Sequence, residues 1–339
     1  MKPTHHRFTF GSVSTLSTRQ QIGAALVVGV AIGAIAYEHY AIQPPGGMSD
    51  FDQVWVAAHA LRSSRDPYAS LAATHWPFPL YYPLTAATLT LPLAFLSVSL
   101  ARVLFFALGS ASLAYALAKR PHRLLALLSG AFFQALILAQ WTPLLTGAAV
   151  VAPLLSGAIW SAKPPIGLAV AIGTLRTRRA WILAAAGALI VVAASLLLDP
   201  RWPLNFFDAA RHAPHIMAPV TILPLGPIVL LALVRWRDPD ARLLVALACM
   251  PQTIAVHETL PLFLIPRTRR QTMILVLLSD GAFAVTMWLL PSLQDGREVS
   301  LAASAPLVGT CLLALCYLPC MVMLLRRPPV ARSSDEAIP

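Results

Sequence analysis

Two closely spaced aspartates, Asp50 and Asp52, begin a short polar stretch of an otherwise apolar sequence, MSDFDQVWVAAHALRSSRDPY, which runs from Met48 to Tyr68 and contains a third, Asp66, near its end. A carboxylate can accept a proton from a hydroxyl group as that group attacks another atom, so Asp50, or alternatively Asp52, is a candidate general base. The same acids can also stabilise the helix that follows them. Ser49 and Asp52 have the spacing of a capping box, and acids in a first helical turn are favoured by the helix dipole. The sequence leaves both interpretations open.

Three further ionisable residues interrupt apolar stretches of the sequence. Lys163 lies between two apolar segments, and His257 and Glu258 break another apolar stretch at a predicted turn. A charge inside an apolar stretch is costly, so such residues are candidates for a functional site. The alternatives are structural, because a lysine at the end of a span reaches toward the lipid headgroups and a polar pair at a loop tip contacts water.

The composition is that of a membrane protein. Of the 339 residues, 58% are apolar and only 12% are charged, whereas roughly a quarter of the residues of a soluble domain are charged. Apolar runs recur along the whole chain, many near the roughly 17–25 residues that a helical span requires. Because the backbone must satisfy its own hydrogen bonds inside a bilayer, we predict an all-α integral membrane protein that forms a polytopic helical bundle.

We predict ten to twelve membrane elements in a single domain over residues 1–327, followed by a disordered cytoplasmic tail at 328–339. Two of the elements, 164–175 and 258–266, would rise only about 18 and 14 Å as helices, so they are half-spans or re-entrant segments. The full set is 21–41, 83–98, 101–118, 122–140, 142–161, 164–175, 181–198, 217–234, 242–256, 258–266, 271–290 and 304–325.

The net charge of +11 comes from short basic loops and not from one basic stripe, so we predict no nucleic-acid partner. The positive-inside rule places these loops and the amino terminus in the cytoplasm of a multi-pass protein of the cell (inner or plasma) membrane. The first loop, 42–82, is then extracytoplasmic. If 83–98 and 101–118 both cross the membrane, the basic loop 119–123 lies outside the cytoplasm, which disagrees with the positive-inside rule. Either this loop breaks the rule or 83–98 does not fully cross.

The first loop has a helical pattern. Its apolar residues on one predicted helix face are Phe51, Val54, Trp55, Ala58 and Leu61. This spacing predicts an amphipathic helix, which we expect to lie on the outer membrane surface with Trp55 at headgroup depth. The run WPFPLYYP, from Trp76 to Pro83, is expected to be an irregular aromatic connection that returns to the bilayer.

The order of features in this loop resembles the first extracytoplasmic loop of glycosyltransferase family 87. The shared features are SDF, a helix with paired alanines, a basic turn that ends in DPY, and an aromatic run into YP. The family consists of C-type membrane glycosyltransferases that use polyprenyl-phosphate sugars and includes mannosyltransferases. The resemblance therefore implies the C-type fold for this helical bundle.

Three short motifs extend the resemblance over roughly residues 22–270. AQWTPLL at 139–145 is similar to the family's GQ-N motif, SAKPPIGL at 161–168 to its lysine followed by proline, and PQTIAVHETLPLFLIP at 251–266 to its SP-W-H segment. The sequence departs from the family pattern at Trp141, Thr142 and Met250.

The resemblance implies a transferase that moves a sugar, mannose or another hexose or pentose, from a polyprenyl-phosphate donor to a lipid or glycan acceptor at the extracytoplasmic face. Asp50 matches the loop aspartate of the family, and Asp52 is an extra acid beside it. Gln140 matches the glutamine of the GQ-N motif. We assign Lys163 to the donor phosphate. Acceptor hydrogen bonds are assigned to His257 and Glu258.

Aromatic and basic residues of the outer loops complete the candidate site. Tyr68, Tyr81 and Tyr82 could line a cleft or stack on sugar rings, although tyrosines also anchor proteins at membrane interfaces. Arg201 and Arg211, in LDPRWPLNFFDAARHAP, are alternative partners of the donor phosphate or contacts to lipid headgroups.

A divalent cation fits the residue types but is not required by their spacing. Carboxylates such as Asp50 and Asp52, together with a donor phosphate, suit magnesium or manganese. The four cysteines lie within apolar runs without ligand spacing, so we predict neither a structural metal nor a disulfide framework. They are Cys249, Cys311, Cys316 and Cys320.

Two other classes compete with an enzyme. A multi-pass transporter or lipid flippase would also combine many spans, broken helices and a few buried charges. Against that class, the sequence shows no inverted repeat and its acids lie in an exterior loop. A non-catalytic subunit of an envelope-polymer pathway is the third class, and the sequence does not define the oligomeric state.

Overall fold

The structure is a computed structural model that describes residues 15–41, 49–74, 76, 78–211, 216–289 and 298–328. The predicted tail beyond residue 328, the basic residues of the first 14 positions and the start of the first loop lie outside these ranges. The described chain is helical, as predicted. Its strands, β1 (Ile216–Met217) and β2 (Gln252–Thr253), form one short antiparallel pair.

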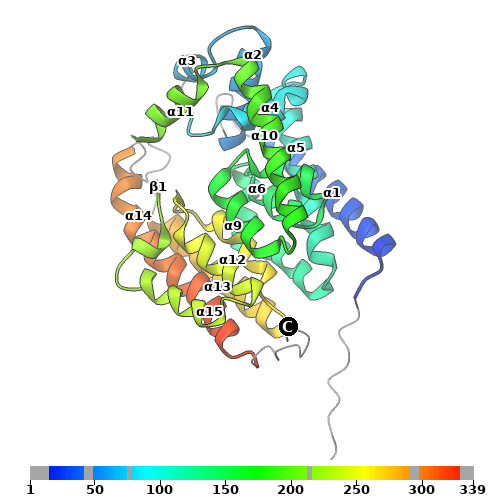
Figure 1. Cartoon of the computed structure of the whole chain (residues 1–339), viewed down its shortest axis with the longest axis vertical. Coiled ribbons are helices and arrows are strands. Elements are labelled where there is room, and N and C mark those ends of the chain that lie inside the picture. The colour runs from blue at the N-terminus through cyan, green and yellow to red at the C-terminus, as the bar shows by residue number, and fades with distance from the viewer. Residues whose placement is uncertain are drawn as a thin grey trace, which may run out of the picture.

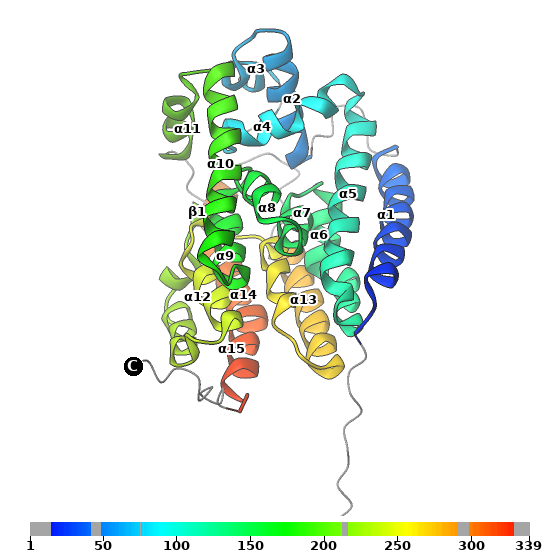
Figure 2. The same cartoon turned by 45° about the vertical axis from the view of Figure 1, so that its right-hand side comes forward.

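Within the described residues, five helical stretches are long and apolar enough to cross a membrane, which agrees with the multi-pass prediction. They are α1 (Thr18–Ala41), α5 (Val98–Ala118), α10 (Arg178–Leu198), α13 (Arg269–Leu289) and Ser304–Leu325. The last stretch combines most of α14 (Glu298–Leu312), a π-helical turn η8 (Leu313–Tyr317) and α15 (Leu318–Leu325). Figures 1 and 2 show these long helices forming the body of the molecule.

Helix α1 lies on the outside of the bundle and packs against α5. Small residues allow the close approach. A Cβ atom added at Gly29 would lie 3.0 Å from the Cβ of Ala111, and one added at Gly33 would lie 3.3 Å from the Cβ of Ala107. Helix pairs in membranes depend on such small-residue contacts because lipid offers no hydrophobic driving force for association.

Shorter helices fill the space between the long ones. They are η2 (Pro121–Leu128), α6 (Gly130–Ile137), α7 (Thr142–Gly147), η3 (Ala148–Val150), α8 (Pro153–Trp160), α9 (Pro164–Thr174), η4 (Pro219–Thr221), η5 (Gly226–Arg235), α12 (Pro239–Cys249) and η6 (Val256–Leu264). The predicted stretches 122–140, 142–161 and 217–234 are thus divided. Prolines explain much of this, because several of these helices begin with a proline at the first or second position, where its missing N–H costs nothing.

The structure corrects the predicted span at 83–98. These residues form α4 (Leu84–Thr90) and the 3-10 helix η1 (Leu91–Phe95), which are too short to cross. They pack instead on α2 (Asp50–Arg62). The Trp55 indole donates a hydrogen bond to the carbonyl of Leu93 (3.3 Å), and the Arg62 guanidinium lies 4.9 Å from the ring centroid of Phe95. Trp55 is therefore part of an intramolecular contact.

This arrangement agrees with the second explanation for the basic loop 119–123, that 83–98 does not fully cross. The segment 84–95 is too short to cross as a helix, so α5 is the second long helix, and it carries the loop to the same end as the other basic loops. The guanidinium of Arg123 donates from Nε to the carbonyl of Pro266 (2.9 Å), directly before the basic loop 267–270. We call this the basic end, formed by 119–123, 176–179, 235–242 and 267–270.

The opposite end, which we call the loop end, carries α2, α3 (Pro67–Ala72) and α11 (Trp202–Arg211). Figures 1 and 2 show these three helices together, with α15 toward the other end. The DPY sequence starts α3, because the Asp66 side chain accepts hydrogen bonds from the backbone N–H groups of Tyr68 (2.8 Å) and Ala69 (3.1 Å). This is a standard N-cap followed by proline.

Helix α2 spans the predicted residues but is more deeply buried than an amphipathic surface helix. Its predicted apolar face, with Phe51, Val54 and Ala58, is buried as expected. Asp52 and Gln53, expected on the polar face, are buried as well. The reason is that α2 contacts α3, α4, η1 and α5, which surround it on several faces. Its N-terminus points into the bundle.

Candidate functional site

Asp52 is engaged in holding α2 in place. Its carboxylate forms an ion pair with Arg102 of α5, with 2.7 Å between Arg102 Nε and Asp52 Oδ1. The Ser49 N–H donates to Asp52 Oδ2 (3.0 Å), as the capping interpretation predicts. Arg102 also lies over the ring of Tyr40, 5.6 Å from its centroid. Both carboxylate oxygens of Asp52 therefore already have partners within the protein.

Asp50 has a different environment, although only one residue separates it from Asp52. The side-chain amide of Gln140 donates to its carboxylate, and its own backbone N–H donates to the carbonyl of Leu138 (3.1 Å). Asp50 is only partly buried. Asp50 thus keeps some exposure to solvent while a buried amide fixes its carboxylate.

The turn after α6 brings Gln140 to Asp50. Ala139 has a φ of 47°, in the left-handed region, and the N–H of Gln140 returns to the carbonyl of Ala135 (2.9 Å). These features are those of a Schellman helix end, in which glycine usually takes the left-handed position. An alanine there is strained by roughly 1–2 kcal/mol, and such strain is often found at functional sites.

A tyrosine and a lysine continue the cluster. The hydroxyl of Tyr82 is 3.5 Å from Oε1 of Gln140, a long hydrogen bond. The Lys163 ammonium lies 5.8 Å from the centroid of the Tyr82 ring, within the range of a cation–π contact. Lys163 stands at the N-cap of α9, where Pro164 and Pro165 begin the helix. The chain therefore breaks beside the ammonium.

Glu258 is the ion-pair partner of Lys163. It lies in η6, where His257 Nε2 is 3.4 Å from Glu258 Oε1. Gln134 of α6 accepts from the backbone N–H of His257 (2.9 Å), and its Oε1 is 3.1 Å from His257 Nδ1. Glu258 Oε2 is buried with no hydrogen-bond partner among the described residues. One acceptor of this site is therefore unused.

We call the group of six side chains the Asp50 cluster. Its members are Asp50, Tyr82, Gln140, Lys163, His257 and Glu258. Four of them are almost fully buried, whereas solvent reaches Asp50 and, through a side chain that is 15% exposed, Lys163. The accessible members are thus one carboxylate and one ammonium.

Burial raises the pKa of Asp50 above its ordinary value. The neighbouring His257 and Lys163 oppose this effect, as does the hydrogen bond from Gln140, while the charge of Glu258 adds to it. A carboxylate with a raised pKa is a stronger base, once deprotonated, than an ordinary aspartate. This is the property that a general base needs.

Three of the predicted residues, Tyr68, Arg201 and Arg211, do not join the cluster. Tyr68 is partly buried, and its hydroxyl donates to the backbone carbonyl of Tyr82 (3.5 Å), so it supports the chain beside the cluster. Arg211 ends α11 and is exposed, and among the described residues no cluster contact involves it. Arg201 is likewise exposed at the loop end.

Sequence reasoning missed Arg102 and Gln134. Arg102 is the one charged residue in the predicted span 101–118, and an isolated charge in an apolar stretch signals a buried partner. Gln134 is a polar residue in the apolar stretch FFQALI, and its side-chain Oε1 contacts both the backbone N–H and the Nδ1 of His257. The same criterion that selected Lys163 would have found them.

The Asp50 cluster combines a base, a cation and hydrogen-bonding groups at the end of a helix. Such a set can deprotonate a hydroxyl and bind an anionic leaving group nearby. Comparison of the chain with protein families, with curated proteins and with solved structures gives no match.

Proposed function

We propose that the protein is a membrane glycosyltransferase that moves a sugar from a polyprenyl-phosphate donor to a hydroxyl of a lipid or glycan acceptor. The observation that supports this most is the Asp50 cluster. Its accessible members, Asp50 and Lys163, are the two groups that such a reaction needs at its two ends. The motifs that resemble glycosyltransferase family 87 contain both residues, Asp50 in the first loop and Lys163 in SAKPPIGL.

The reaction is a single displacement at the anomeric carbon. The acceptor hydroxyl forms a bond to that carbon, its proton passes to the Asp50 carboxylate, and the bond from the carbon to the phosphate oxygen breaks. The polyprenyl phosphate leaves with the electron pair. A single displacement inverts the anomeric configuration. General-base catalysis of this kind contributes roughly 10²–10⁴-fold to the rate.

Lys163 supplies positive charge where the phosphate leaves. Its ammonium is held by Glu258 and by the face of the Tyr82 ring, so its position requires little reorganisation during the reaction. Glu258 is itself fixed by its neighbour His257, which Gln134 orients. We assign His257 and Glu258, whose Oε2 is unused, to hydrogen bonds with the acceptor.

The loop end is the extracytoplasmic face in this proposal. The basic end gathers the arginine-rich loops, which the positive-inside rule places in the cytoplasm. Asp50 then accepts protons at the outer face, where a lipid-linked sugar donor would be consumed. The proposed step gives Asp52 no chemical role, because its carboxylate is bound to Arg102.

The experiment is a transfer assay with the purified protein in lipid vesicles. Polyprenyl-phosphate mannose, glucose and arabinose are offered as radiolabelled donors together with a lipid extract as the acceptor. We expect one donor to give a labelled product, and Asp50→Asn to reduce that transfer by at least about 100-fold. Absence of transfer from all three donors, or full transfer by the variant, contradicts the proposal.

A further inference from the structure

The basic end contains a cavity that the proposed reaction does not use. Its volume is about 430 Å³, within the roughly 300–1,000 Å³ of ligand pockets. Five cationic side chains line it, and Asp240 is the one acid among the described lining residues. The cations are Lys119, Arg120, Arg123, Arg176 and Arg267.

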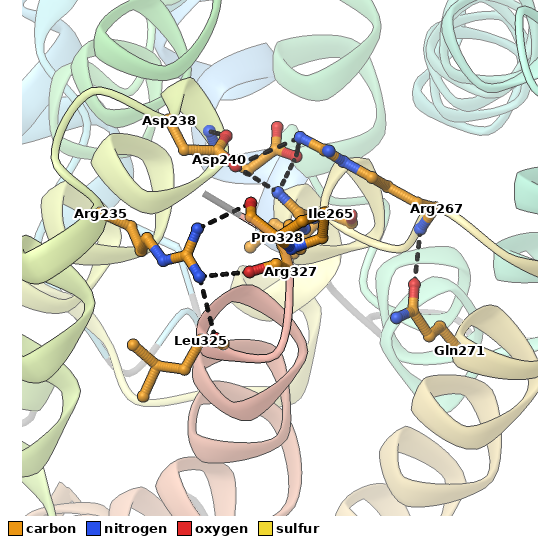
Figure 3. A network of polar contacts seen from close by, with 9 residues as sticks. All are labelled: Arg235, Asp238, Asp240, Ile265, Arg267, Gln271, Leu325, Arg327 and Pro328. Atoms are coloured by element: carbon orange, nitrogen blue, oxygen red, sulfur yellow. Dashed lines mark hydrogen bonds and ion pairs between the residues drawn. The ribbon is translucent and has the colours of Figure 1, made fainter. Parts of the chain in front are cut away.

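The acids of this end are already bound to other arginines. Figure 3 shows the network around Arg327, whose Nη1 lies 2.8 Å from an oxygen of Asp238 and 2.8 Å from an oxygen of Asp240. Arg267 is 3.2 Å from Asp238 and 3.8 Å from Asp240. Burial alone would raise the pKa of Asp238, but the hydrogen bonds from Arg327 and the Asp240 N–H, together with the charges of Arg327 and Arg267, outweigh it and lower that pKa.

The other four cations of the cavity form no ion pair with an acid of the described residues. Burial and the charge of Arg120 lower the pKa of Arg123 to about 10, although the charge of Asp240 opposes them. The Nε of Arg123 is fixed on the carbonyl of Pro266 (2.9 Å). Its guanidinium is thereby oriented next to a like charge, an arrangement that an anion would stabilise.

Apolar side chains also line the cavity. They are Ala116, Ala149, Val150, Leu243 and Leu264. Cations together with apolar side chains suit a phosphate group that is attached to a less polar body. Arginine binds phosphate oxygens in a bidentate manner, and basic pockets at the cytoplasmic ends of membrane helices bind lipid phosphates.

We infer that this cavity is a binding site for a phosphate-bearing anion on the face opposite the Asp50 cluster. Helix α9 links the two, because Lys163 precedes its first residue while Gly173 and Thr174 at its end line the cavity. Its 11 residues separate them by about 16 Å. The inference does not depend on the proposed transfer reaction. The phosphate belongs either to an anionic lipid or to a soluble molecule.

The test compares two triple variants of the full-length protein. The cavity variant is Lys119→Gln, Arg120→Gln, Arg176→Gln. The matched control, Arg178→Gln, Arg179→Gln, Arg270→Gln, removes the same charge from exposed positions at the same end that do not line the cavity. The wild type and both triple variants are studied in phosphatidylcholine nanodiscs. Phosphatidylglycerol is added in one arm of the experiment and inorganic pyrophosphate in the other.

The readouts are the unfolding temperature and, in the lipid arm, the number of phosphatidylglycerol molecules retained in native mass spectrometry. We expect an anion to raise the unfolding temperature of the wild type and of the control. The cavity variant should bind more weakly by about fivefold for each cation lost. A response in the lipid arm alone assigns the phosphate to a headgroup, and a response to pyrophosphate assigns it to a soluble ligand.

The inference is overturned if neither arm stabilises the wild type, or if both triple variants lose binding equally. Equal loss would mean that the arginines act only through the overall charge of this end. Increasing the salt concentration gives an independent check, because binding through these partly exposed cations should weaken as salt screens them.

Discussion

At the residue scale, Asp50 and Asp52 differ in what their carboxylates contact. Asp52 is bound by Arg102 and Ser49, whereas Asp50 receives one amide hydrogen bond and stays partly exposed. The sequence suggested both a capping and a catalytic interpretation for this pair of acids. In the structure, capping belongs to Asp52, and Asp50 remains the candidate base.

The raised pKa of Asp50 predicts an acidic limb in the pH profile. A general base acts only when it is deprotonated, so the rate of transfer should fall as pH decreases through this pKa. Because burial raises the pKa, the limb should lie above the ordinary aspartate value of about 3.9. The measurement is kcat/KM against pH. A rate that stays constant down to pH 4 contradicts this assignment.

The Lys163–Glu258 pair allows stability and function to be separated. Lys163→Met leaves Glu258 buried without its cation, and we expect a loss of about 3–5 kcal/mol in the free energy of unfolding. Adding Glu258→Gln removes the unpaired charge and should recover most of that loss, while transfer stays low. Chemical unfolding in detergent and the transfer assay measure the two effects.

This prediction fails in either of two ways. A double variant no more stable than Lys163→Met would show that the pair does not determine the loss. A double variant with wild-type transfer would show that the ammonium has no role at the phosphate.

At the element scale, α2 depends on the ion pair that joins it to α5. Arg102→Met would leave the buried carboxylate of Asp52 unpaired and should cost about 3–5 kcal/mol. Hydrogen exchange should rise along Asp50–Arg62 before it rises in α5. Arg62→Gln is the control, because its exposed contact with Phe95 should contribute at most about 1 kcal/mol. Equal losses from the two substitutions would contradict this role of Asp52.

Much of α2 could be predicted from the sequence, whereas the packing of 84–95 against it could not. The periodicity from Phe51 to Leu61 and the Ser49–Asp52 spacing are local signals, and the structure contains the helix and its cap. Hydropathy assigned 83–98 to the membrane because it measures composition only. It does not show that a short stretch with Pro92 in its middle packs against another helix.

The Asp50 cluster could be predicted as a set of residues but not as a site. Its hydrogen bonds and ion pairs join positions 90 residues apart for Asp50 and Gln140, and 95 residues apart for Lys163 and Glu258. Spacing along a helix or a loop contains no information about such contacts. What the sequence does contain is the cost of placing each polar group in an apolar stretch, which identified most of the members.

At the scale of the whole molecule, the loop end and the basic end should lie on opposite sides of the membrane. Single cysteines at Arg65 and Lys119, both exposed, test this in a protein whose four native cysteines are replaced by alanine. A membrane-impermeant maleimide added to intact cells should label Arg65→Cys but not Lys119→Cys. Opening the cells should expose the second site. Labelling of both in intact cells would contradict the assignment of 84–95 as a segment that does not cross.

The most direct test of the account is the transfer rate of Asp50→Asn beside that of Asp66→Asn. The two substitutions remove the same charge from the same loop. Asp66 is an exposed N-cap, and asparagine caps helices about as well as aspartate. With equal amounts of each protein in vesicles, we predict transfer reduced by at least about 100-fold for Asp50→Asn and near the wild-type rate for Asp66→Asn. Equal rates for the two variants would contradict a catalytic role for Asp50.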